Sequence, residues 1–437
     1  MRRKALTLLL VSVIFLTSCS KDTPLVPQPS TNEADYTAYD YSDHTDSSEA
    51  VYKTLLADTS AIGEGKPVFA QNELPADWSW VRFPGFDAKD EVFGYDVRSC
   101  DISGEDLSPV TDFNDLCFDT NTTWPKQLPE GFNPKKLLND NKNPGLGIRA
   151  LHKKGITGKG VGIAIIDQAL LLEHEEYKDN INLYERIHCS DDTAQMHGPA
   201  VASIAVGKKI GVAPKAKLYY IASTFGHSTD SGYDFDASIM ADAILRILEV
   251  NEDLPKEDKI RVISISKGYS NRDNGYDELQ AAIKKADEAN VFVLTTSTGE
   301  YYKDFNLFGM DRDYEKDPEE VSSYEPVSWV AEDYYSNPER YASYNFMLVP
   351  IGSRTIAGCT DTDDYALAHN GGLSWAVPWC AGFYALCCQV KPDITPQEFI
   401  ELAYSTATTT EIEHEGKTYS FGKIINPAGV IDELKNK

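Results

Sequence analysis

The chain has 437 residues, of which 42% are hydrophobic and 25% are charged, so it can bury a large core as one domain or two. Its 68 acidic residues outnumber its 41 basic residues and give a formal net charge of −27 at pH 7. Nucleic acid and anionic lipid headgroups are therefore poor candidate partners, because such a surface repels both.

Residues 1–18 have the features of an export signal. Three basic residues near the start precede an apolar run that is too short to span a bilayer as a helix. The tetrapeptide Leu-Thr-Ser-Cys that follows this run ends at Cys19 and resembles the bacterial lipobox. The resemblance implies a bacterial cell-envelope protein that is exported and lipid-anchored through Cys19. A plain secretory signal is the alternative.

Composition divides the remaining chain into three parts. Residues 19–49 are rich in Ser, Thr, Asp and Pro, which predicts a flexible tether. Residues 50–123 contain clustered aromatic residues and short strand-like pieces, and we expect an accessory or pro-like region there. The main domain is expected to occupy residues 124–437.

The cysteines other than Cys19 predict neither a metal site nor a disulfide framework. Seven of them are scattered or lie in an apolar run, and they form no Cys-x-x-Cys pair and no zinc-type spacing with histidine. A disulfide between Cys100 and Cys117 is conceivable in an exported protein, but the spacing alone does not predict one.

The main domain alternates apolar strands with helical segments. Such continuous apolar strands are typical of a sheet buried on both faces, so the pattern predicts an α/β fold with a mostly parallel central sheet and helices on each side. The segment from Tyr301 to Tyr344 is polar and aromatic, and we expect an irregular insertion that shapes a cleft. Strands are expected at 161–166, 217–222, 262–266 and 291–296, and helices at 239–249 and 278–289.

Three side chains that could take part in catalysis lie at the ends of these elements. Asp167 ends the first strand, at the sheet edge where function gathers in open α/β folds. His197 opens a helix of small residues, whose dipole favours a neutral imidazole that can act as a base. Ser374 follows two glycines and opens a long apolar segment, Trp375–Val390. Taken singly, each also has a structural interpretation as a turn cap, a packed histidine or a helix N-cap.

Together the three residues form the set needed for nucleophilic catalysis, in the order Asp, His, Ser. The local sequences resemble motifs of the subtilase family of serine proteases. The resemblance extends over residues 124–437 and is carried by four segments in order, Gly158–Asp167, His197–Ala202, Gly211–Pro214 and Gly372–Pro378.

The resemblance implies a subtilisin-like three-layer fold and a serine endopeptidase that hydrolyses peptide or protein substrates through an acyl-enzyme. Asp167 would orient the imidazole, His197 would act as base and Ser374 as nucleophile. The family requires no cofactor for this chemistry. It often carries structural calcium, for which no ligand set can be assigned here. By the same resemblance, an extended substrate would pair with Ser266, Lys267 and Gly268.

The sequence departs from the family at Glu300, where the family places an asparagine that donates to the oxyanion. An ionised carboxylate has no donor and would repel that charge. Glu300 could donate only if burial kept it protonated, and Asn306 in the following segment is an alternative donor. A second hypothesis is therefore a catalytically weak or inactive subtilase-fold protein that binds peptides or proteins at the surface. A general esterase is disfavoured, because no Gly-x-Ser-x-Gly sequence surrounds Ser374.

Overall fold

The structure is a computed structural model that describes residues 68–69, 89, 94–108, 110–189, 194–229 and 232–436. The expected signal peptide, Cys19 and the tether lie outside the described residues, so those expectations stay predictions. The expected accessory region, 50–123, is described only in part.

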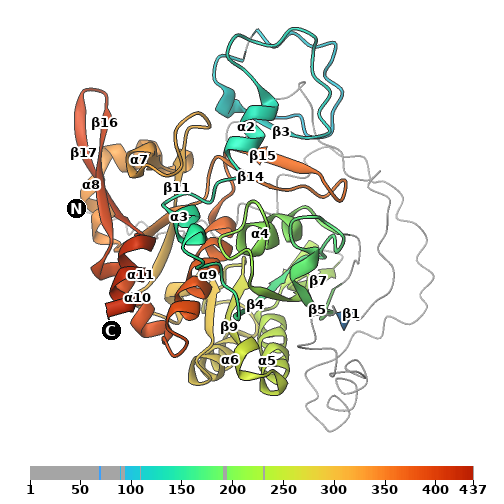
Figure 1. Cartoon of the computed structure of the whole chain (residues 1–437), viewed down its shortest axis with the longest axis vertical. Helices are drawn as coiled ribbons and strands as arrows, with labels where there is room; N and C mark the ends of the chain where they lie inside the picture. The colour runs from blue at the N-terminus through green and yellow to red at the C-terminus, as the bar shows by residue number, and fades with distance from the viewer. Residues whose placement is uncertain are drawn as a thin grey trace, which may run out of the picture.

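A six-stranded parallel sheet forms the centre of the molecule (Figure 1). Its strand order is β1 (Val68–Phe69), β5 (Ile181–Arg186), β6 (Lys217–Ala222), β4 (Gly162–Asp167), β9 (Ile260–Ile265) and β10 (Phe292–Thr295). β4 is buried along its whole length, as expected of a strand covered on both faces. Its registers with β6 and β9 place Ile163 opposite Leu218 and Val262. The predicted α/β fold class with a parallel sheet is confirmed.

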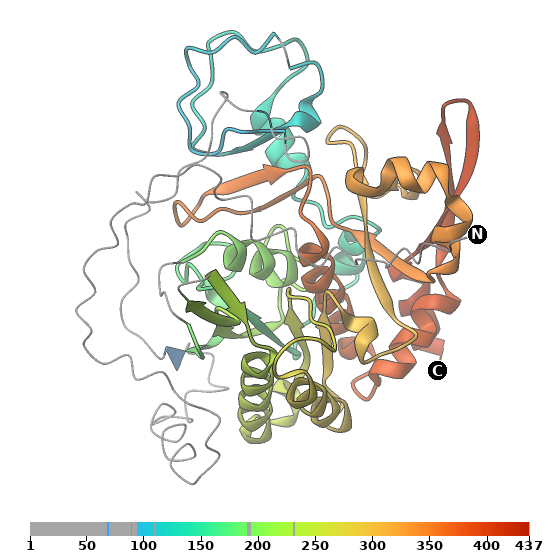
Figure 2. The same cartoon turned by 180° about the vertical axis from the view of Figure 1, so that it is seen from behind.

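Helices cover both faces of this sheet (Figures 1 and 2). On one face, α5 (Ala237–Asp253) packs beside α6 (Tyr276–Glu288), and on the other, α4 (His197–Val206) packs beside α9 (Leu373–Val390). α5 begins earlier than the sequence predicts because the side chain of Asp236 accepts a hydrogen bond from a backbone N–H of the first turn.

α9 is the core helix of the fold. By length and hydropathy alone it could cross a membrane, but 83% of its most apolar window is buried inside the protein. It packs against strands of the central sheet and also against α4. Gly382 permits the close approach to α4, because a Cβ at this position would lie 3.1 Å from the carbonyl oxygen of Ala205 in α4 and 2.7 Å from Val212 Cβ in the following turn. Few substitutions at Gly382 can therefore keep α9 in place.

The segment 301–344 is more regular than expected. It contains two strands and two helices and joins a second sheet beside the first. Long aromatic side chains order it, since they pack where polar side chains would remain in solvent; Phe308, for example, stacks on Phe346 with ring centroids 4.5 Å apart. The second sheet has the order β12 (Tyr324–Pro326), β11 (Asn306–Arg312), β13 (Phe346–Pro350), β17 (Lys417–Ile424) and β16 (Thr408–His414), and the helices are α7 (Ser328–Ser336) and α8 (Pro338–Ser343).

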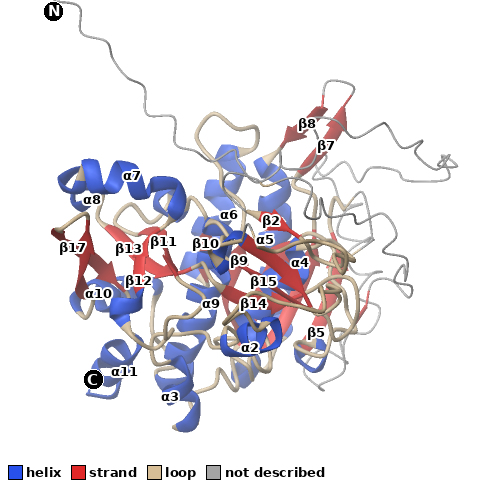
Figure 3. Ribbon diagram, turned by 90° about the horizontal axis from the view of Figure 1, so that it is seen from above, coloured by secondary structure: helices blue, strands red, loops and turns tan. Residues whose placement is uncertain are grey.

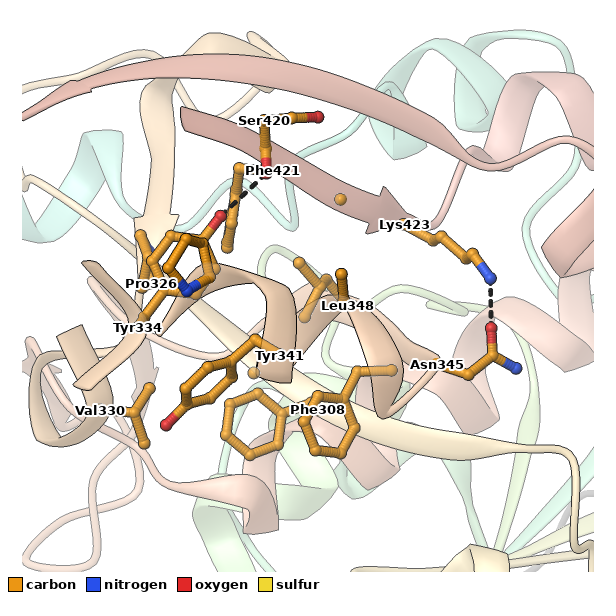
Figure 4. A pocket seen from close by; sticks show the side chains of 15 residues that line it. Phe308, Pro326, Val330, Tyr334, Tyr341, Asn345, Leu348, Ser420, Phe421 and Lys423 are labelled. Carbon is orange, nitrogen blue, oxygen red and sulfur yellow. Dashed lines mark hydrogen bonds between the residues drawn. The ribbon is translucent and has the colours of Figure 1, made fainter. Parts of the chain in front are cut away.

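An aromatic pocket lies between these two helices and the second sheet. Figure 4 shows Phe308, Tyr341 and Tyr334 around it, with Tyr334 donating a hydrogen bond of 2.9 Å to the carbonyl of Ser420. Lys423 donates to the side chain of Asn345 at one end. The insertion therefore builds a cavity of its own, and none of the predicted site residues lines it.

A third sheet joins the N-terminal part to the main domain. Its order is β14 (Arg354–Ala357), β15 (Tyr365–Ala368), β3 (Leu116–Asp119) and β2 (Tyr95–Asp96). β3 pairs antiparallel with β15, the strand that leads into the segment before Ser374 (Figure 2). Strands on the two sides of the expected boundary at residue 124 thus belong to one sheet.

The remaining elements connect or flank these sheets. A hairpin of β7 (Gly226–Thr229) and β8 (Gly232–Phe235) projects beside α5 (Figure 3). The other helices are α2 (Pro134–Asp140), α3 (Ile148–Lys153), α10 (Pro396–Ser405) and α11 (Pro427–Asn436). Short 3₁₀ turns lie at Phe113–Asp115, Lys178–Asn180, Lys256–Asp258, Thr298–Glu300 and Val321–Ser323.

Candidate active site

Asp167 and His197 meet at the carboxyl end of β4. His197 Nδ1 lies 2.7 Å from Asp167 Oδ1, and the two side chains are 27% and 1% exposed, respectively. The backbone N–H of Gln168 donates to the same carboxylate oxygen at 2.8 Å. Burial disfavours the imidazolium, but the charge and hydrogen bond of Asp167 outweigh this effect and raise the pKa of His197. The pair can therefore hold a proton received from a nucleophile.

A glycine brings α4 close enough to β4 for this contact. A Cβ at Gly198 would lie 2.6 Å from the carbonyl oxygen of Gln168 and 2.7 Å from the Tyr220 hydroxyl. Tyr220 in turn donates to the carbonyl of Gln168 at 2.5 Å. The Tyr220 hydroxyl on β6 thus holds the turn after Asp167, and with Gln168 in this turn the Asp167 carboxylate still reaches His197.

Ser374 is the second residue of α9, where the first backbone N–H groups of the helix have no intrahelical acceptor. Its Oγ lies 3.3 Å from the carbonyl oxygen of Ser266 and makes no hydrogen bond to His197 among the contacts of the described residues. Free enzymes often hold such groups apart until substrate arrives. Rotation of the Ser374 side chain would be needed to engage the imidazole.

Ser266 also supports the helix itself. Pro378 lies in the second turn of α9 and has no N–H to donate to the Ser374 carbonyl four residues earlier. The Ser266 hydroxyl supplies the missing donor at 2.7 Å. The two serines are therefore linked in both directions, and Ser266 acts through its side chain as well as through its predicted backbone role.

The turn before Ser374 depends on two glycines and on Asn370, which the sequence analysis missed. Gly372 has a φ of 62°, and a Cβ at Gly371 would lie 1.8 Å from the Trp375 ring. The Asn370 side chain accepts the N–H of Gly372 at 3.1 Å. An Asn two residues before a Gly is a common turn signal, which could have found it.

Lys267 and Gly268 follow β9 beside this turn. The Lys267 carbonyl accepts the N–H of Thr296 at 3.3 Å, and its own N–H donates to Ile265 at 2.8 Å. Lys267 is half-buried, and its charge lowers the pKa of His197 against the larger effect of Asp167, which raises it. Of the predicted substrate-binding residues, Ser266 thus contacts Ser374, and the charge of Lys267 acts on His197.

Glu300 ends a 3₁₀ turn after β10, and its side chain is partly exposed. Burial and the neighbouring Glu300 carboxylate both raise the pKa of Tyr276, so this carboxylate lies toward the start of α6. The Asn306 side chain packs on the same turn, because a Cβ at Gly299 would lie 2.0 Å from Asn306 Oδ1. The alternative donor named from the sequence is therefore adjacent to the expected oxyanion position.

No cluster of three or more histidine, cysteine or acidic side chains within the described ranges is arranged to hold a metal ion. None of the described cysteines, Cys100 and Cys117 included, forms a disulfide bond.

The parallel α/β core, with Asp167, His197 and Ser374 at one end of it, has the architecture and residue types of a serine hydrolase. A family model described as "Subtilase family" matches residues 158–423. The chain belongs to the subtilase family of serine proteases, as the sequence motifs predicted.

Two further proteins are similar to this chain. Protease KEX1 of Kluyveromyces lactis is 26% identical over 327 residues, which cover 66% of this chain and 40% of that protein. The chain thus matches less than half of this relative. The solved structure of the prenylagaramide maturation protease PagA has 17% identity and a TM-score of 0.46, covering 67% of this chain and 99% of that one.

Proposed function

We propose that this protein is a serine endopeptidase that hydrolyses peptide bonds through an acyl-enzyme on Ser374. His197 would take the proton of the Ser374 hydroxyl as the oxygen attacks the substrate carbonyl, and would return it to the leaving amine. Asp167 would hold the imidazole and stabilise its charged form. Water would then release the acyl group by the same route. The observation that carries this proposal is the 2.7 Å contact between buried Asp167 and His197.

The oxyanion needs at least two donors, and the chain offers candidates in spite of Glu300. The free N–H of Ser374 at the start of α9 is one, because helix N-termini stabilise negative charge. Asn306 is the other candidate: its Oδ1 packs on the Gly299 turn, and its Nδ2–H group would be the donor. The Glu300 carboxylate lies near Tyr276, and no ion pair among the described residues holds it away from these two donors. If it turned toward them, its negative charge would repel the oxyanion.

The test is hydrolysis of an internally quenched peptide library by the soluble form, residues 20–437, beside Ser374→Ala and Asn306→Ala. We expect cleavage that Ser374→Ala abolishes and that Asn306→Ala lowers by about 10²–10³ in kcat, the usual cost of one oxyanion donor. Cleavage that persists in Ser374→Ala would refute the mechanism.

Glu300 favours one second candidate, a surface module that binds peptides and cleaves them weakly or not at all. The substitution Glu300→Asn separates the two. A large gain in kcat would show that the glutamate restrains catalysis and would support the binding module. A loss or no gain, with an active natural protein, would support the protease.

We further propose that the protein is exported and anchored in the bacterial cell envelope by lipid on Cys19, with residues 19–49 as a tether. The support is the order of basic start, apolar run and lipobox-like sequence. Metabolic labelling with a lipid probe should mark the natural protein and fail with Cys19→Ala. Equal labelling of both would contradict the anchor.

A further inference from the structure

Lys267 brings a positive charge to the site that the backbone role of this segment does not use. Its ammonium lies 4.9 Å from the ring centroid of Phe235 and 5.9 Å from that of Tyr233, both on the β8 strand of the projecting hairpin (Figure 3). Its charge also reaches His197 and Asp167. Two aromatic rings thus lie within 6 Å of one cation, and its charge also acts on the Asp167–His197 pair.

The cation has no carboxylate partner among the described residues. No Asp or Glu oxygen in these ranges lies within 4.0 Å of Lys267 Nζ, and the nitrogen makes no hydrogen bond there. Asp273 acts on it only through space and accepts from the N–H of Ser270 at 2.6 Å. Asp167 is already bound to His197. Burial therefore dominates and lowers the pKa of Lys267.

A half-buried ammonium without an acceptor is unusual, because desolvation without pairing costs free energy. A charge held in this way beside reactive groups is typical of a site that a ligand completes. The rings of Phe235 and Tyr233 limit the directions from which water can reach it. What can complete the site is an anionic group presented next to the Ser266–Gly268 edge.

We propose that Lys267 binds an acidic side chain of the substrate close to the scissile bond, so that the enzyme prefers peptides with Asp or Glu at one position. This inference rests on the proposed peptidase function and adds its substrate class. The net charge of −27 repels acidic proteins at long range. Salt screens that repulsion beyond about 8 Å at physiological ionic strength, whereas a contact pair is screened much less.

The experiment compares matched peptides that carry Asp or Asn at each of four positions on either side of the cleaved bond. For the natural protein we expect kcat/KM to be about tenfold higher with Asp at one position, which corresponds to one partly buried pair. Lys267→Met should remove the preference, and Lys267→Glu should reverse it in favour of Lys at that position.

Lys284→Met is the matched control, because it removes one positive charge from the exposed face of α6, where Lys284 is 69% exposed. It should leave the preference unchanged. Equal cleavage of Asp and Asn peptides by the natural protein would overturn the inference and leave the proposed function intact. An equal loss of the preference in Lys284→Met and Lys267→Met would also overturn the inference and leave the proposed function intact.

If no peptide is cleaved, the proposed function fails and the inference is decided by binding. Fluorescence anisotropy would then measure the same Asp and Asn peptides against Ser374→Ala with and without Lys267→Met. Tighter binding of one Asp peptide that needs Lys267 supports the site. Equal binding of the Asp and Asn peptides, or a preference for Asp that Lys267→Met leaves unchanged, refutes it.

Discussion

At the scale of single residues, the site depends on hydrogen bonds that compensate for local departures from regular structure. Pro378 interrupts the bonding of α9 and Ser266 repairs it. Asn370 closes the turn that Gly372 permits. The nucleophile is therefore held by polar contacts from outside its own helix, and each can be removed singly.

We predict that Ser266→Ala lowers the free energy of unfolding by about 1–3 kcal/mol, because the Ser374 carbonyl would lose its donor. Urea unfolding measures this. Ser264→Ala is the control, since Ser264 is fully buried on β9, two residues before Ser266, and its hydroxyl has no hydrogen-bond partner among the described residues. It should be neutral or stabilising. A cost for Ser264→Ala equal to that for Ser266→Ala would contradict the account.

Sequence patterns revealed the residue types of the site but not all of its contacts. The strand end at Asp167 and the helix start at His197 followed from periodicity and helix electrostatics. The position of Asn370 and the side-chain role of Ser266 did not, since both depend on which segments the fold brings together. A one-dimensional pattern carries no such distance information.

At the scale of elements, the site depends on how closely α4 approaches the end of β4 and α9 approaches α4. Two glycines permit these approaches: Gly198 at the start of α4 and Gly382 within α9. The parallel sheet and its helices could be predicted because buried strands are continuously apolar. The order within 301–344 could not, because its aromatic side chains alternate with polar ones without a clear period.

Gly198→Ala should displace the start of α4 and lower kcat/KM by more than tenfold, because the added methyl would meet the Gln168 carbonyl at 2.6 Å. Gly104→Ala is the control, since a Cβ there meets nothing within 4 Å. Peptide hydrolysis and circular dichroism would be measured on both. A folded, fully active Gly198→Ala protein would show that α4 needs no such approach.

At the scale of the whole molecule, a buried carboxyl group makes the stability of the fold depend on pH. Asp311 at the end of β11 is 2% exposed and accepts the N–H of Ser328 at 3.2 Å. Burial raises its pKa to about 7. The unfolded chain releases this proton near pH 4, so between these values the folded state binds more protons and stability falls as pH rises.

We predict that Asp311→Asn removes a decline of about 1.4 kcal/mol per pH unit between pH 5 and pH 7. Asparagine keeps an oxygen for the N–H of Ser328 and carries no titrating proton. Urea unfolding at pH 5 and pH 7 should show a smaller decline in the variant than in the natural protein. The same decline in both would mean that Asp311 is ionised in the folded state.

The most direct test of the central claim is covalent labelling of Ser374 by a fluorophosphonate, followed by mapping of the modified peptide. We predict stoichiometric label on Ser374 alone, lost in His197→Ala, and a labelling rate that falls as pH drops below the raised pKa of His197. A folded protein that takes no label at any pH from 5 to 9, or that labels equally without His197, would contradict the account.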